Sequence, residues 1–180
     1  MEKIEIQEII DLCEEAESDY LKLYRPLLGY EDEVKLNRGI DDSMEGILDE
    51  IEAKVGIKFP ADLLQLYLIA NGGRYFGVNL FHLSNDRNDI NGLYYNNTSE
   101  TLRDRYKIPS NTLIIGETKE DELILIGIDE DGYYAYCTWD KEEKKMNVDF
   151  GYILELLVYE IDYNTGAFQV EYNEEEDLDI

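Results

Sequence analysis

The sequence predicts an α+β fold in which an antiparallel sheet has helices packed mainly on one face. Three observations support this. Residues 40–70 carry apolar side chains at three- and four-residue spacing, which is typical of helices. Residues 112–150 carry short strand patterns separated by acidic turns, which favours antiparallel hairpins. Residues 152–162 return to helical spacing, so a final helix is expected to cover the sheet.

A single domain over residues 1–180 is expected, because the chain is long enough to bury one core and has no linker-like segment. Within it we expect residues 1–39 to form an N-terminal helical extension, since residues 4–24 have helical apolar spacing. That helix would pack on the domain or offer a near-heptad seam to a partner helix. Residues 173–180 are rich in acids and predict an acidic tail.

The first helix of the pair is predicted to begin after Asp42. An aspartate side chain can accept hydrogen bonds from the free N–H groups of a first turn, and Glu45 is spaced to complete a capping box. The apolar stripe then consists of Ile40, Met44, Ile47, Ile51 and Val55. Gly56 is expected to end the helix, because glycine adopts the left-handed conformation easily.

The second helix is predicted to start at Pro60, since a first-turn residue needs no backbone N–H. Its buried side would consist of Leu63, Leu66, Tyr67 and Ala70. Asn71, Gly72 and Gly73 are expected to stop it.

After these helices the pattern alternates. The predicted elements are a strand over residues 75–83, a helix over 97–106 with Thr98 or Ser99 near its cap, strands over 112–116, 123–128, 133–139 and 146–150, a helix over 152–162 and an edge strand over 167–172.

This arrangement resembles the SUKH superfamily (Smi/Knr type), many of whose bacterial members are immunity proteins of toxin systems. The resemblance lies in the acidic helix that ends in Val55-Gly56, the following Ile57-Lys58-Phe59-Pro60-Ala61-Asp62, and the Leu/Tyr-rich helix that runs into Asn71-Gly72-Gly73. The later hairpins, an aromatic strand with the Trp139-Asp140 step and a last apolar helix also match, so the likeness covers about residues 40–160.

The formal net charge of −26 excludes some classes of partner. Such a field repels nucleic acids and anionic membranes and attracts basic protein surfaces. No apolar run reaches the roughly 18 residues of a membrane span, and the acidic start is unlike a signal peptide. Cys13 and Cys137 lie far apart in unlike contexts, which favours reduced thiols over one long-range disulfide and indicates the cytoplasm.

Motifs of catalysis, cofactors and metals are missing from the sequence. There is no phosphate-binding glycine loop, no paired Cys or His motif and no nucleophile elbow. His82 is the only histidine and is expected to be a hydrogen-bonded core residue. The 42 acids allow many carboxylate pairs without favouring one, so a carboxylate hydrolase stays a weaker alternative to a binding protein without cofactor or metal.

The predicted aromatic strand offers a candidate partner surface. Because side chains alternate along a strand, Tyr133 and Trp139 would lie on the covered face while Tyr134, Tyr136 and Thr138 point to the open face. Exposed tyrosines among acids are typical of protein interfaces, although tyrosines are also simply good strand formers. The adjoining turn with Asp129 and Asp131 is expected to contribute, and Tyr94 with Tyr95 gives a second, smaller patch.

The resemblance implies an immunity protein that binds and neutralises a cognate toxin. The toxin is expected to present a basic surface, and a nuclease is one candidate. Inhibition would be stoichiometric and electrostatically steered. The alternative is a general cytoplasmic interaction or regulatory module without a toxin partner.

Overall fold

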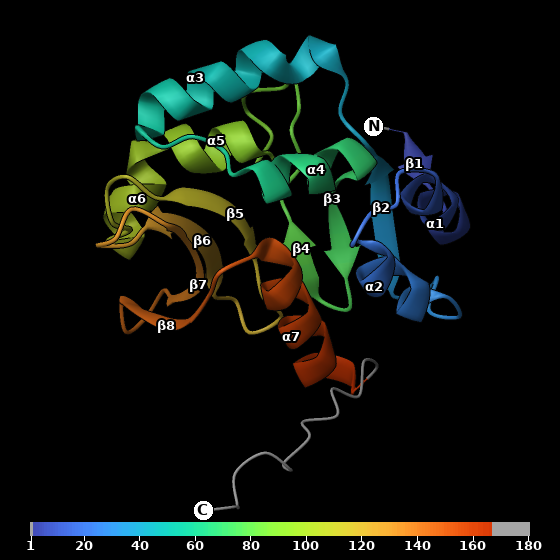
Figure 1. The fold of residues 1–180 in the computed structure, drawn as a ribbon. Helices are drawn as coiled ribbons and strands as arrows, with labels where there is room; N and C mark the ends of the chain where they lie inside the picture. The colour runs from blue at the N-terminus through green and yellow to red at the C-terminus, as the bar shows by residue number, and fades with distance from the viewer. Residues whose placement is uncertain (1, 167–180) are drawn as a thin grey trace, which may run out of the picture.

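Eight strands form one antiparallel sheet in which the spatial order equals the order along the chain. The computed structural model describes residues 2–166 (Figure 1). The strands are β1 (Lys3–Ile4), β2 (Val34–Arg38), β3 (Ala70–Tyr75), β4 (Val78–Leu80), β5 (Leu113–Glu117), β6 (Leu123–Ile128), β7 (Tyr134–Asp140) and β8 (Lys145–Phe150). Every strand therefore pairs with the strand before it, and the sheet is a meander.

The helices surround this curved sheet. They are α1 (Ile6–Glu15), α2 (Leu21–Tyr24), α3 (Glu45–Val55), α4 (Ala61–Ile69), α5 (Leu93–Thr98), α6 (Glu100–Tyr106) and α7 (Ile153–Thr165), with 3₁₀ turns at Arg25–Leu27 and Asp42–Met44. Figure 1 shows α4 and α7 in front of the sheet, α1 and α2 beside β2, and α3 with α5 across the upper end. The α+β prediction is confirmed.

The N-terminal segment differs from the expected helical extension. The helix predicted over residues 4–24 is broken after Glu15, because Glu17 has a left-handed backbone with φ of 49°. The expected helical extension also contains β2, which buries Val34 and Leu36 and leaves Lys35 exposed. β1 and β2 thus add two strands to one end of the sheet.

The Asn71-Gly72-Gly73 segment lies inside β3 and does not end a helix as predicted, because α4 already stops at Ile69. The single strand expected over residues 75–83 is a hairpin that turns at Phe76-Gly77. The glycines are needed for packing. A Cβ on Gly72 would lie 2.7 Å from the carbonyl oxygen of Leu80, and one on Gly73 would lie 2.6 Å from that of Lys35.

Two buried asparagines complete the backbone hydrogen bonding where strand pairing stops. The Asn71 side chain donates to the Leu83 carbonyl at 2.9 Å and accepts from the Leu83 N–H at 2.7 Å. Asn97 does the same for Ile114, donating at 2.8 Å and accepting at 2.8 Å. Because an unpaired buried backbone group is costly, these amides hold the loop after β4 and helix α5 against the sheet.

Helix α3 begins later than predicted. Residues 42–44 form a 3₁₀ turn, Met44 occupies the N-cap position without a side-chain cap, and the Asp42 side chain lies outside the described part of the structure. Gly56 ends the helix in the left-handed conformation with φ of 81°, as predicted. Pro60 is the N-cap of α4, one residue before the first-turn position expected for it.

The second half follows the sequence prediction closely. β5 to β8 and α7 match the expected strands and helix within a few residues at each end. The helix expected over residues 97–106 is two helices, and Ser99 between them accepts from the Leu102 N–H at 3.4 Å as the cap of α6. The predicted edge strand over 167–172 and the acidic tail over 173–180 lie outside the described residues.

Both cysteines are free and buried in the core. Burial raises the pKa of the Cys13 thiol, and burial together with the nearby Asp149 raises the pKa of Cys137 to about 12. The thiols are therefore protonated and unreactive at neutral pH.

Asp62, in the first turn of α4, joins three parts of the fold. Its carboxylate accepts from the Tyr136 hydroxyl on β7 at 2.6 Å and from the Ile153 backbone N–H at 3.0 Å. Ile153 is the first residue of α7, so the carboxylate caps that helix from outside and faces the positive end of its dipole. The Asp62 carbonyl also accepts from the Tyr20 hydroxyl at 2.5 Å, which ties in the segment before α2.

Asp62→Ala is predicted to lower the free energy of unfolding by about 3 kcal/mol, because it leaves the Tyr136 hydroxyl and the Ile153 N–H without their acceptor. Tyr136→Phe removes only one of the two hydrogen bonds and is expected to cost about 1 kcal/mol. Urea unfolding measures both. Tyr133→Phe is the matched control, since Tyr133 is 71% exposed. An Asp62→Ala variant as stable as the control would contradict this role.

Candidate partner-binding surface

The tyrosines of β7 do not form the exposed plate that the sequence predicts. Tyr136 is 0% exposed and its hydroxyl is used by Asp62, while Thr138 is also buried and Tyr134 is half-buried. The prediction that Tyr134, Tyr136 and Thr138 point to an open face is wrong, because α4 and α7 cover this side of β7. Trp139 is covered as expected: it is buried and its indole N–H donates to the Tyr106 carbonyl at 3.1 Å. Tyr133, expected on the same covered face, is instead 71% exposed at the end of the β6–β7 turn.

The remaining predicted contact residues lie apart from one another. Tyr94 and Tyr95 are half-buried on α5, and the Arg87 guanidinium lies over the Tyr94 ring at 5.3 Å from its centroid. Asp129 and Asp131 are exposed in the β6–β7 turn, where the Asp129 carboxylate accepts from the backbone N–H groups of Asp131 and Tyr133. Their structural role in the hairpin is clear from these contacts.

Exposed aromatic rings gather instead on α7 and at its N-cap, Tyr152. Tyr152 is 63% exposed and Tyr163 65% exposed. The Tyr159 ring stacks on Tyr163 with centroids 6.3 Å apart and packs against Phe150 at 5.2 Å. Glu155, Tyr159 and Tyr163 follow at four-residue spacing, so they share one side of the helix.

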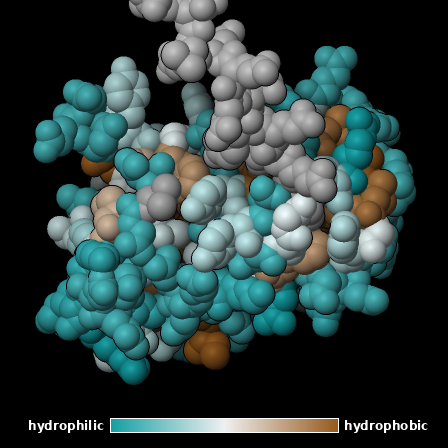
Figure 2. All heavy atoms as spheres, turned by 90° about the horizontal axis from the view of Figure 1, so that it is seen from below, coloured by the Kyte–Doolittle hydropathy of each residue, from teal (hydrophilic) through white to brown (hydrophobic). Residues whose placement is uncertain are grey.

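A groove of about 710 Å³ runs beside this stripe. One side is formed by α7, and the other by residues in and before α2 and by the first turns of α4. Leu154 and Val158 form an apolar wall, and the carboxylates of Asp19, Asp62 and Glu155 lie along it. We call it the α7 groove; it is lined by Asp19, Tyr20, Lys22, Asp62, Gln65, Tyr152, Leu154, Glu155 and Val158. Figure 2, which looks at the end of the molecule where α7 lies, shows a mostly hydrophilic face broken by separate hydrophobic patches.

Glu160, on another side of α7, is the carboxyl with the largest pKa shift among the described acids. Burial, followed by repulsion from Glu122 and Glu120 in and beside the β5–β6 turn, raises its pKa to about 7. Glu122 already accepts from the Asn147 amide at 2.6 Å. This cluster holds surplus negative charge that a cation from outside would relieve.

Sequence reasoning missed both Asp62 and the α7 tyrosines. The Pro60-x-Asp62 spacing reads as an ordinary acid in a first helical turn, and only the tertiary fold shows that the acid caps a different helix. The four-residue spacing of Glu155, Tyr159 and Tyr163 is a sequence signal for an exposed stripe on this helix. The apolar spacing used to predict the helix identifies only the face that the helix buries.

His82 is half-buried and hydrogen-bonded, as expected, with its Nε2 at 2.7 Å from the Asp89 carboxylate. Among residues 2–166 no group of three or more His, Cys, Asp or Glu side chains is arranged to hold a metal ion. Over the same residues, none of the helices is long and apolar enough to span a membrane.

Glu160 generates a prediction on pH dependence. A carboxyl whose pKa is raised on folding binds protons more tightly in the folded state, so stability falls as the pH rises from about 4.5 to about 7 and stays low above that range. Glu160→Gln is expected to be more stable than the parent at pH 8 and equal to it at pH 4, measured by urea unfolding at both values. Glu130→Gln, an exposed acid in the β6–β7 turn, is the control. A difference between Glu160→Gln and the parent that does not change with pH would contradict the assignment.

Comparison with known proteins gives the family. No curated protein matches the chain. The model of the SMI1 / KNR4 family (SUKH-1) matches residues 45–156, from the first residue of α3 to the first turn of α7. The match includes Asp62, Tyr136 and Ile153, so the Asp62 junction lies within it, whereas β1, α1, α2 and β2 lie before it. Since more than half of the chain is covered, the chain belongs to the SMI1 / KNR4 (SUKH-1) family.

Proposed function

We propose that the chain is an immunity protein that binds a cognate toxin and neutralises it stoichiometrically, without catalysing a reaction. The proposal rests on its family, many of whose bacterial members are immunity proteins, and above all on one observation: the exposed acidic and aromatic surface of α7. The toxin would present a basic surface, and the encounter would take place in the cytoplasm.

The α7 tyrosines support this role because they combine area with little loss of entropy. A tyrosine ring buries a large apolar surface, has few rotatable bonds and offers a hydroxyl at its rim. The Tyr163 ring stacks on Tyr159, and Tyr159 in turn packs against Phe150, so part of the entropy cost of ordering these rings is already met in the free protein.

The α7 groove supports a basic partner. Its apolar wall of Leu154 and Val158 can pack the methylene stem of a lysine or arginine, while Glu155 and Asp19 lie where the charged end would emerge. Among residues 2–166, Lys22 is the only cation that lines the groove, and it already lies 3.4 Å from the Asp19 carboxylate. A net charge of −26 adds long-range attraction, which chiefly speeds association.

The test of function is co-expression with a toxin encoded beside this chain. Rescue of growth, together with a 1:1 complex by size-exclusion chromatography, is expected. Rescue without a complex would point to turnover and contradict stoichiometric inhibition. Capture of partners without any protective effect would favour the alternative, a general interaction or regulatory module.

The surface has its own test. The double variant Tyr159→Ala/Tyr163→Ala is predicted to weaken toxin binding at least about tenfold, because aromatic anchors carry most of the energy of an interface. Tyr30→Ala is the matched control: Tyr30 is 44% exposed, close to the 39% of Tyr159, and likewise packs on one phenylalanine, Phe76 at 5.1 Å. Equal loss in both variants would contradict the use of α7.

Glu155→Lys is predicted to lower the association rate and to make it less sensitive to salt, because it reverses a charge on the groove. Stopped-flow measurements from about 50 to 300 mM NaCl would show it. An association rate that does not change with salt in the parent protein would remove electrostatic steering from the proposal, even if binding remained.

A further inference from the structure

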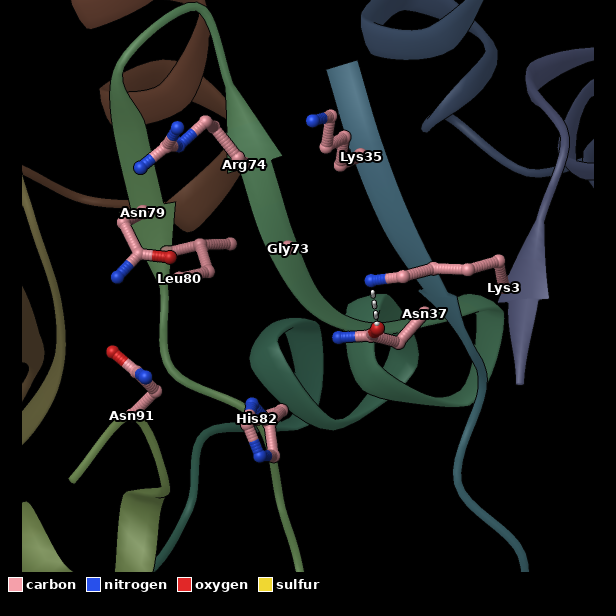
Figure 3. Close-up of a pocket in the computed structure, with 9 residues that line it drawn as sticks. All are labelled: Lys3, Lys35, Asn37, Gly73, Arg74, Asn79, Leu80, His82 and Asn91. Carbon is pink, nitrogen blue, oxygen red and sulfur yellow. Dashed lines mark hydrogen bonds between the residues drawn. The ribbon is translucent and has the colours of Figure 1, made fainter. Parts of the chain in front are cut away.

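A second pocket of about 460 Å³ lies on the other face of the sheet, over β1 to β4. Lys35, Arg74 and Asn79 are directly opposite one another in register across β2, β3 and β4. The neighbouring row Val34, Tyr75 and Val78 is buried, and Tyr75 meets Tyr24 of α2 at 3.1 Å between hydroxyls. Lys35 and Arg74 therefore lie on the opposite face of the sheet from Tyr24. Figure 3 shows both side chains with the other residues that line the pocket.

The pocket is positive in a strongly negative protein. Three of its nine lining residues are cations, Lys3, Lys35 and Arg74, and none is an acid, although the chain contains 42 acids. Half of the 16 Lys and Arg residues form ion pairs within the described residues, but these three form none there. Two acids adjoin the pocket, but each has a partner: Glu117, opposite Asn79 in register, pairs with Lys141, and Asp89 contacts His82. The three cations repel one another, and a bound anion would relieve that repulsion.

The floor of the pocket is built from amide side chains. Asn37 is buried, accepts from the Lys3 ammonium at 2.9 Å and donates to the Asn71 carbonyl at 3.1 Å, which fixes the position of Lys3. Asn79 and Asn91 face the opening from the other side (Figure 3). Gly73 contributes no side chain, so the middle of the floor stays open.

The lining also indicates which anions fit. Apart from the His82 imidazole, the pocket has no aromatic ring on which a nucleobase could stack. Amides and cations hydrogen-bond well to compact oxyanions, and charge-assisted bonds of this kind are strong. The net charge of −26 opposes a long anionic polymer more than a small ligand, because the polymer carries its charge past the acidic parts of the surface.

We propose that this pocket is a binding site for a small, compact polyanion that carries phosphate or carboxylate groups. Lys35 and Arg74 hold one anionic group from above, Lys3 holds another from the side, and the amides of Asn37, Asn79 and Asn91 contact the oxygens. The pocket shares no lining residue with the α7 groove, so the proposal does not rest on toxin binding.

Calorimetric titration of the full chain with pyrophosphate and with citrate tests the proposal and separates phosphate from carboxylate recognition. Saturable 1:1 binding of at least one is expected, with amide NMR shifts centred on Gly73, Asn37 and Asn79. ADP should bind no more tightly than pyrophosphate, because the one ring among the lining residues, the His82 imidazole, is already engaged by Asp89. Absence of saturable binding by both compounds would overturn the proposal.

Lys35→Gln/Arg74→Gln is expected to weaken binding at least about tenfold, since charge-assisted hydrogen bonds are lost. Arg105→Gln/Lys119→Gln is the matched control, because it removes two exposed cations outside the pocket and changes net charge equally. Thermal melting checks that both variants fold. Equal weakening in both would mean non-specific attraction and would overturn the site.

Tighter binding of a synthetic peptide of residues 167–180 than of either small anion would also overturn it, in favour of an acidic peptide segment.

Discussion

The hydrogen bonds of Asp62 are the contacts on which the rest of the arrangement depends. One residue at the start of α4 contacts β7 through its carboxylate, the first turn of α7 through the same carboxylate, and Tyr20 through its carbonyl. An ionised acceptor that serves two donors is worth more than two neutral hydrogen bonds, and it also neutralises the positive end of a helix. The Asp62–Ile153 hydrogen bond joins α4 to the start of α7, the two elements that flank the α7 groove.

The two faces of the molecule differ in charge. On the side of α7, Glu155, Tyr159 and Tyr163 form a stripe beside an apolar groove, and Glu160 shares its surroundings with two further acids. On the other side, three cations gather over a floor of amides. A protein with a net charge of −26 can thus present one region that attracts basic surfaces and a smaller region that attracts anions.

Local sequence rules were enough for the second half of the fold. β5 to β8 alternate or run continuously apolar and are joined by acidic turns, so their pairing followed from neighbouring residues. The rules failed for β3, because Ala70-Asn71-Gly72-Gly73 has the composition of a helix stop and becomes a strand only through pairing with β2 and β4. They failed at α1 for a similar reason: the break at Glu17 interrupts apolar spacing that continues to Leu23.

The candidate site was harder to predict than the fold. Which face of β7 is open depends on where α4 and α7 pack, and the alternation of Tyr134, Tyr136 and Thr138 carries no information about that. The family resemblance, by contrast, rested on residues whose importance the structure explains. Gly56 supplies a left-handed helix end, Gly72 and Gly73 permit close strand approach, and Asn71 replaces a missing strand partner.

The order of the elements along the chain bears on biosynthesis. The meander pairs each strand with its predecessor, so the sheet can assemble progressively as the polypeptide emerges. The bond from Asp62 to Ile153 instead spans 91 residues, which a ribosome adds in roughly 5 to 20 s. A nascent or prematurely terminated chain that ends before α7 can therefore contain the sheet while lacking the groove and its aromatic stripe. Complete translation of α7, more than formation of the sheet, therefore decides whether a molecule carries the surface that we propose for partner binding.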